Sequence, residues 1–241
     1  MIHLILVVDS LQPTELVNRT PKSSAGNEWY LDPDNGMSQV VAALRRQILD
    51  SKLITRPIGA TLLNIFGGHD LAAITRMVGP ISSVSATAGK LFPTTIMHDV
   101  EGKPTDTVLP SPYPDNIAFN GTLADHPGAV VNVFWRTVPI TGEKNPNRLL
   151  AVIDGDEGVI RFGGDQPLSN LCLYTPDKVY VNNEEVALED TPISGNIGRN
   201  WAEFAKGDKG VYPTWEDAVK VHELVDAIEK SAEKGVRVTV A

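Results

Sequence analysis

Hydrophobic positions in the first third of the chain predict one strand and two helices. The apolar run at residues 2–8 has the length of a strand and is far too short to span a membrane. In residues 38–51, apolar side chains recur at helical spacing, which predicts a helix. A second helix is predicted over residues 60–78, because the segment stops at Gly79-Pro80, a strong signal for a helix end.

The pattern changes to short β-rich runs over residues 81–186. Turn signals such as Asp154-Gly155-Asp156 and Asn182-Asn183 separate several of them. Short runs joined by tight turns favour antiparallel meander connections without crossover helices. This part of the chain therefore predicts one large antiparallel sheet.

The chain closes with a helix whose two ends are marked in the sequence. Thr214 is placed to cap the helix N-terminus, Asp217 follows three residues later as a variant of the capping box, and Gly235 marks the end. We expect one face of this helix to be apolar: Ala218, Val221, Val225, Ile228 and Ala232. The order of elements predicts an α+β fold, a large mostly antiparallel β-sheet with helices packed on one face.

Composition narrows the class of partner. The 241 residues carry a formal net charge of −9 and have no basic cluster beyond Arg45-Arg46, so nucleic acid is not an expected partner. The lone Cys172 excludes an intramolecular disulfide and structural zinc, and we expect it to be a small buried hydrophobe. No segment resembles a signal peptide or a membrane span, which favours a cytoplasmic protein.

Several motifs of known chemistry are missing from the sequence. It contains neither G-x-G-x-x-G nor G-x-x-x-x-G-K-[ST], so we expect no cofactor in this chain. It also lacks G-x-S-x-G and H-E-x-x-H, so no motif supports a hydrolase activity.

One segment has chemical character, Phe66-Gly67-Gly68-His69-Asp70. Two glycines within a helix cost about 1 kcal/mol each relative to alanine, and they are retained where a backbone or ligand approaches closely. The spacing places His69 on a face with Leu62, Ile65, Phe66 and Ala73. Two interpretations are open: a core histidine bonded to a backbone carbonyl, or a histidine that transfers protons.

The remaining histidines, tryptophans and acidic residues favour structural roles. We expect His98 in a loop, His126 in a turn and His222 at the edge of the last helix. Trp135 and Trp201 are predicted core anchors, and Trp215 is predicted to pack against the start of the last helix. Asp154, Asp156 and Glu157 lack the Gly and distal Glu of a calcium loop, so they indicate a solvated hairpin turn.

Four segments carry a family resemblance: GATLLNIFGGHDLAAITRMVGPISSVSA, PDNIAFNGTLADHPGAVVNVFWR, LLAVIDGDEGVIRF and YPTWEDAVKVHELVDAIEKSAEKGVRV. Together they resemble the C-terminal domain of the glucose–fructose oxidoreductase / inositol dehydrogenase / MocA family, and in particular its fungal branch that includes the galactose-regulon repressor. The resemblance covers residues 26–36 and 59–241. Its most specific parts are the GGH motif and the terminal pattern S-x-x-x-G-x-x-V.

The resemblance implies a function for this domain. Members have an N-terminal Rossmann domain that binds NAD or NADP and a C-terminal domain whose sheet shapes the substrate pocket and commonly serves dimerisation. We therefore expect a homodimer through the sheet face and a sugar or polyol ligand. The family's Glu-Lys-Pro motif is expected upstream of Met1, so the isolated chain is expected to have no turnover.

The resemblance also implies a candidate catalytic residue, His69. It corresponds to the family histidine that acts as general acid and base on the substrate hydroxyl. The aspartate four residues earlier, which partners this histidine in dehydrogenase members, is Ile65 here, and Asp70 is expected on a different helix face. This departure keeps a second hypothesis open, a non-catalytic regulator or scaffold of the galactose-repressor type that binds a protein partner through its sheet.

The resemblance divides the chain into three parts: residues 1–36, a strand and loop; 37–59, an insertion; and 60–241, the oxidoreductase-family domain. In the family pattern, the Asp-x-x-Asn-Gly turn at residues 32–36 runs straight into the helix with GGH. Two explanations of the insertion are open. It is a translated intron, since Gly36-Met37-Ser38 is compatible with the splice donor GTATGT, or a genuine amphipathic helix over a domain edge.

Overall fold

The computed structural model describes seven stretches of the chain: residues 3–10, 61–98, 104–111, 113–137, 149–164, 178–188 and 193–240. The chain divides into two compact units. The first comprises residues 1–11, 61–92 and 112–241, and the second residues 12–60 and 93–111. The predicted helix at 38–51, the insertion at 37–59 and Cys172 lie outside the described residues.

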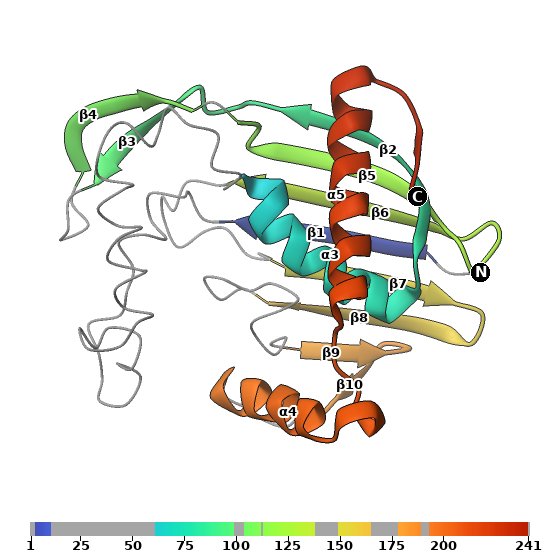
Figure 1. The fold of residues 1–241 in the computed structure, drawn as a ribbon. Helices are drawn as coiled ribbons and strands as arrows, with labels where there is room; N and C mark the ends of the chain where they lie inside the picture. Colours follow the sequence, from blue (N-terminus) through green and yellow to red (C-terminus); the bar gives the residue numbers. More distant parts are fainter. Residues whose placement is uncertain are drawn as a thin grey trace. The chain divides into compact units, whose positions relative to one another are not determined.

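The first unit is built on a nine-stranded sheet (Figure 1). The strands lie in the order β10-β9-β8-β7-β1-β6-β5-β2-β11. Their bounds are β1 His3–Ser10, β2 Ile81–Gly89, β5 Asn116–Leu123, β6 Val130–Thr137, β7 Leu149–Gly155, β8 Gly158–Gly164, β9 Lys178–Val181, β10 Glu184–Val186 and β11 Val238–Thr239. Among the described strands, β1 and β6 are the one parallel pair, and every other pair is antiparallel. The predicted mostly antiparallel sheet is confirmed.

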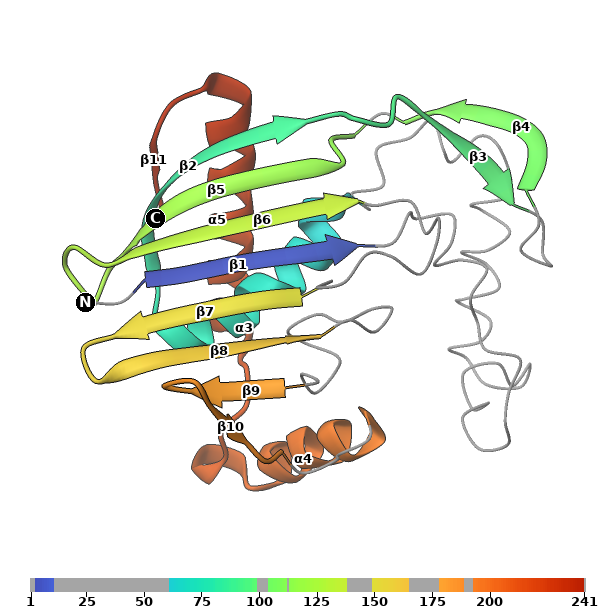
Figure 2. The ribbon, with the colours of Figure 1, turned by 180° about the vertical axis from the view of Figure 1, so that it is seen from behind.

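Helices cover one face of this sheet. A π-helical turn, η1 Leu63–Gly67, continues into α3, Gly68–Val78, and α5, Trp215–Lys234, packs along β2. In Figure 2 the sheet is seen from behind, with α3 and α5 on its far side. The α+β fold with helices on one face is therefore confirmed. The remaining helices are α4, Ile193–Ala205, and a short 3₁₀ turn, η2 Gly207–Lys209.

The core lies between the sheet and these helices because the strands alternate. In β5 and β6, every second side chain is buried. Phe119 and Trp135 are the largest of them, and their ring centroids lie 5.6 Å apart. Ile74 of α3 and Ile228 of α5 are fully buried from the helix side. Such alternation buries one face of an antiparallel sheet and leaves the other open.

The predicted ends of the last helix are confirmed in α5. The Thr214 hydroxyl accepts from the Asp217 amide at 3.2 Å, and the Asp217 carboxylate accepts from the Thr214 amide at 2.8 Å. Gly235 closes the helix in the left-handed conformation with φ 65°. The predicted apolar face is correct for Val225 and Ile228, which are buried, but wrong at the start of α5, where Ala218 is exposed.

Of the two predicted tryptophan core anchors, one is confirmed and one is wrong. Trp135 is fully buried, as predicted, but Trp201 is 66% exposed. Trp215, which was predicted to pack against the start of the last helix, is 86% exposed at the first residue of α5, so this prediction is also wrong. Apolar spacing on a helix identifies its apolar face, but it does not show whether another element covers that face.

The described part of the second unit is a hairpin. It consists of β3, Thr94–His98, and β4, Pro104–Pro110, which pair antiparallel. His98 therefore ends a strand and does not lie in a loop, which corrects the expectation from sequence. His126, in contrast, lies exposed in the bend between β5 and β6, as predicted.

Candidate functional site

The GGH motif lies where η1 passes into α3. His69, the second residue of α3, is exposed, whereas Asp70, the next residue, is fully buried. The interpretation of His69 as a core histidine is therefore wrong. Ile65, which the resemblance places at the position of the family aspartate, lies in η1.

The buried stripe of this helix is shifted by one position from the predicted one. It contains Leu63, Gly67, Asp70, Leu71, Ile74 and Val78. The prediction used hydrophobic residues only and placed His69 and Ala73 on the buried face. Because Gly67 and Asp70 are not hydrophobic, the hydrophobic pattern alone favours the wrong phase of the helix.

The two glycines of the motif differ in their surroundings. A Cβ on Gly67 would lie 2.8 Å from Leu63 Cδ1, which is a clash, and 3.6 Å from Trp135 Cη2, which is an ordinary contact. A Cβ on Gly68 would meet no atom within 4 Å. Gly67 therefore leaves room for the Leu63 side chain one turn earlier, whereas no packing in the described residues requires Gly68.

A buried hydrogen bond joins this helix to the sheet. Trp135 Nε1, on β6, donates to Asp70 Oδ2 at 2.9 Å, and both side chains are fully buried. Reasoning from sequence missed this pair, because residues 65 positions apart meet only after the sheet has formed. The one signal available was an acidic residue on the same helix stripe as Ile74 and Val78.

The start of α3 lacks the geometry of a pyrophosphate-binding helix N-terminus. The first turn of α3 continues from η1, and Gly67 has helical angles (φ −59°, ψ −45°), so this is not the free helix N-terminus that binds a pyrophosphate. No group of three or more metal-ligating side chains occurs within the described stretches. Asp156 and Glu157 form the turn between β7 and β8, which agrees with the predicted hairpin turn.

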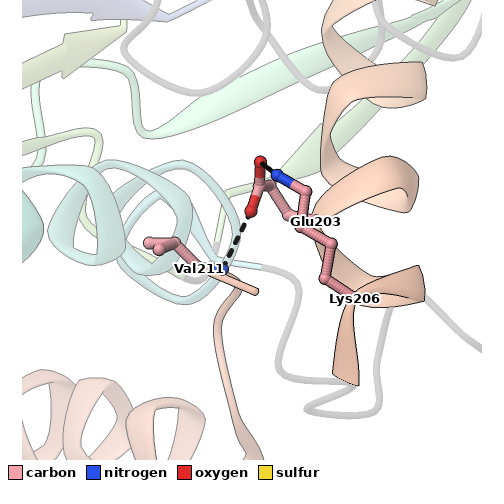
Figure 3. Close-up of polar contacts among 3 residues, drawn as sticks. All are labelled: Glu203, Lys206 and Val211. Atoms are coloured by element: carbon pink, nitrogen blue, oxygen red, sulfur yellow. Dashed lines mark hydrogen bonds and ion pairs between the residues drawn. The ribbon is translucent and has the colours of Figure 1, made fainter. Parts of the chain in front are cut away.

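A second polar cluster ties the chain after α4 back onto that helix (Figure 3). Glu203 Oε2 accepts from the amide of Val211 at 3.1 Å, and Oε1 bonds to the Lys206 ammonium. These two contacts, first the one to Lys206, lower the pKa of the Glu203 carboxyl. The cluster fixes the loop that leads to α5.

Next to this cluster, α4 presents aromatic residues outward. Trp201 and Phe204 lie edge to face with centroids 5.7 Å apart, and Phe204 meets Tyr212 at 5.2 Å. Ile197 lies one turn before Trp201 and is also exposed. Trp201 was predicted to be a core residue, so this exposed aromatic surface was missed at the level of sequence.

The open face of the sheet carries polar side chains near β2 and β5, with the Arg237 guanidinium bonded to two of them. Ser83 and Thr122 hydroxyls lie 2.7 Å apart, and Arg237 Nη2 donates to Ser83 at 2.7 Å. Asn120 and Asn132 are hydrogen-bonded to each other on neighbouring strands. Because these groups satisfy each other, this face can be desolvated at less cost than one with unpaired polar groups.

The described part of the chain contains no helix long and apolar enough to cross a membrane.

Comparisons with known proteins agree with this architecture. Gal80p and levoglucosan dehydrogenase are structural neighbours of this chain, so the predicted resemblance to C-terminal domains of the glucose–fructose oxidoreductase / inositol dehydrogenase / MocA type is confirmed. Residues 46–164 match the family model of the Gal80p C-terminal domain.

Individual relatives are distant. Dehydrogenase aclE from Aspergillus oryzae is 28% identical over 185 residues, which are 73% of this chain and 48% of the relative. A super-repressor mutant of Gal80p from Saccharomyces cerevisiae has a TM-score of 0.65 at 18% identity, over 99% of this chain and 57% of that one. Levoglucosan dehydrogenase in complex with NADH and L-sorbose has a TM-score of 0.61 at 18% identity, over 99% and 58%. The chain thus spans about half the length of these relatives.

Proposed function

We propose that this chain is the substrate-binding and dimerisation domain of an NAD(P)-dependent sugar or polyol oxidoreductase-like protein. The observation that carries the proposal is His69, exposed at the start of α3 in a fold shared with levoglucosan dehydrogenase. That relative is described in complex with NADH and a sugar. The proposed location is cytoplasmic.

In this function His69 exchanges a proton with a substrate hydroxyl. A neutral imidazole accepts the proton as the hydroxyl is oxidised and returns it in the reverse reaction. In this proposal Ile65 stands where the resemblance expects the partner aspartate, so His69 acts without that carboxylate. Amino-acid side chains do not accept a hydride, so the proposed reaction depends on a nicotinamide cofactor. Part of the proposal is that the isolated chain has no turnover.

Two binding experiments test this proposal. Titration of the chain with a panel of sugars and polyols, followed by NMR of the histidine side chains, should shift the His69 resonance, and His69→Gln identifies that resonance. Calorimetry with NAD(H) and NADP(H) should detect no tight binding. Low-micromolar affinity for either nucleotide, or no sugar that perturbs His69, would overturn the proposal.

A second candidate function is that of a non-catalytic regulator that binds a protein partner through its sheet. The isoleucine at position 65 favours this function, because a binding protein does not need the aspartate that pairs with the catalytic histidine in dehydrogenases. The fold shared with Gal80p also supports it. Ile65→Asp discriminates between the two in a protein that also carries any nucleotide-binding domain encoded by the gene. A gain of sugar-dependent NAD reduction favours a decayed enzyme, and no gain favours the regulator.

Dimerisation through the open sheet face is part of the proposal. The mutually bonded hydroxyl and amide groups on β2, β5 and β6 support it. Sedimentation of the chain at micromolar concentration should show a dimer. Asn132→Lys, which places a charge at the centre of this face, should shift the chain to monomer, whereas Lys230→Gln on α5 serves as the control. A wild-type chain that sediments only as monomer contradicts this part.

A further inference from the structure

Asp70 is a buried carboxylate for which the proposed chemistry has no use. It is adjacent to His69 in sequence, yet it is fully buried and lies 2.9 Å from the indole nitrogen of Trp135. A carboxylate is unfavourable in a protein interior unless donors and dipoles compensate for the lost water. Its presence on an otherwise apolar helix stripe therefore calls for a specific role.

The surroundings of Asp70 show what it holds in place. It is the third residue of α3, and its helix continues without a break from η1. Trp135 belongs to β6 in the interior of the sheet and packs against Phe119. A Cβ on Gly67 would lie 3.6 Å from the same indole ring, in ordinary van der Waals contact. The hydrogen bond from Trp135 therefore fixes the first turn of α3 on the sheet.

We propose that Asp70 is a positioning residue for His69, an inference that rests on the proposed role of His69. Successive helical residues point about 100° apart, so His69 lies about 200° from Leu71. A turn that holds both Asp70 and Leu71 inward therefore presents His69 on the solvent side. Asp70 is not the acid–base partner of His69, because its carboxylate is bonded to Trp135 on the buried side. It acts through the backbone of the turn.

Three variants test the proposal in the full chain. Trp135→Phe removes the indole N–H but keeps an aromatic ring, and Asp70→Leu removes the acceptor. Asp70→Asn keeps an acceptor oxygen in nearly the same shape and is the conservative variant. Phe162→Leu, on β8, reduces another core ring away from α3 and is the control for general destabilisation.

The readouts are the NMR signal of the His69 ring and amide hydrogen exchange in residues 68–72. Trp135→Phe and Asp70→Leu should broaden or shift the His69 signal and speed exchange in this turn by about tenfold, the size expected when a buried partner is lost. Asp70→Asn should restore both values toward wild type. Phe162→Leu should leave the His69 signal unchanged.

The proposal is overturned if the His69 signal of Trp135→Phe and Asp70→Leu matches that of wild type. It is also overturned if Asp70→Asn behaves like Asp70→Leu, or if Phe162→Leu has the same effect. None of these readouts needs a substrate or a cofactor. A failure of the proposed function would appear as a missing sugar response in the wild-type chain, so the two failures are distinguishable.

Discussion

Ser231 of α5 and Ala86 of β2 are joined by a hydrogen bond in which the Ala86 amide donates to Ser231 Oγ at 2.8 Å. The same hydroxyl donates to the carbonyl of Val236 at 2.6 Å, just beyond the helix end. Ser231 is almost completely buried. One side chain thus connects the sheet, the last helix and the return of the chain, which gives a physical reason for the serine in the terminal S-x-x-x-G-x-x-V pattern.

Replacing this serine should destabilise the domain. Ser231→Ala leaves the Ala86 amide and the Val236 carbonyl without this partner, which we expect to cost about 1–3 kcal/mol of unfolding free energy. Urea denaturation of the variant measures it. Thr239→Ala, an exposed hydroxyl on β11, is the control and should change the unfolding free energy little. Equal effects of the two variants would contradict the assignment.

The two glycines of the GGH motif should respond differently to alanine. Gly68→Ala adds a methyl group in open space within a helix and should stabilise by about 0.5–1 kcal/mol. Gly67→Ala places a methyl group 2.8 Å from the buried Leu63 and should cost about 1–3 kcal/mol. Thermal unfolding of both variants, compared with wild type, measures these two changes in stability. If Gly68→Ala is also destabilising, the surroundings described for Gly68 are incomplete.

The capping box of α5 should make stability depend on acid. Hydrogen bonds from the Thr214 amide and hydroxyl lower the pKa of the Asp217 carboxyl. A lowered folded-state pKa means that this contribution is present above the unfolded pKa, about 3.9, and is lost as the pH falls through the folded value. Comparison of wild type and Asp217→Asn by urea denaturation should show a difference at neutral pH that shrinks under strong acid.

A second substitution tests the Thr214 side of the capping box of α5. Thr214→Ala removes the N-cap acceptor and should cost about 1 kcal/mol at neutral pH. Ser85→Ala, a similar loss of a hydroxyl on β2, should cost less because no helix end depends on it. A difference between wild type and Asp217→Asn that stays constant down to strong acid would contradict the ionised carboxylate as the capping group.

Glu229 should have the opposite dependence on pH. Partial burial, followed by the negative charges of Asp226 and Glu233, raises the pKa of its carboxyl. The folded state therefore favours the protonated form, and this contribution is lost as the pH rises through the folded value. Glu229→Gln should stabilise the chain at neutral pH by about 0.3 kcal/mol, the scale of a like-charge helix pair.

The gain from Glu229→Gln should disappear below about pH 4, where the unfolded carboxyl is also protonated. Thermal unfolding across this range checks it. Lys230→Gln changes the net charge by the same amount in the opposite sense and is not expected to stabilise. A gain that persists at low pH would point to packing and not to charge.

Local signals were sufficient for much of the fold. The ends of α5 follow from Thr214, Asp217 and Gly235 because capping depends on neighbours a few residues apart. The hairpin turns and the antiparallel sheet follow for the same reason. What failed is not local: the parallel pairing of β1 with β6 and the exposure of Trp201 depend on which elements meet in space.

In the candidate site, too, features set by neighbouring residues could be predicted, whereas features set by contacts between distant elements could not. The GGH motif and its helix were predictable, and His69 was identified by resemblance. The phase of the helix was not, because the stripe that packs on the sheet includes Gly67 and Asp70, which hydrophobicity does not mark. Asp70 is hydrogen-bonded to Trp135, and spacing along the sequence cannot identify a partner 65 residues away.

The position of β1 has a consequence for assembly. It is the first strand of the chain, yet it lies inside the sheet, between β6 and β7. Without it, the sheet would consist of two separate ribbons, each with a row of unpaired backbone groups along an interior edge. The gap between these ribbons is one strand wide. β1 fills it by pairing parallel with β6 and antiparallel with β7. A chain that lacks residues 1–11 would thus be a receptor for a free peptide of this sequence, and for the first strand of a neighbouring molecule.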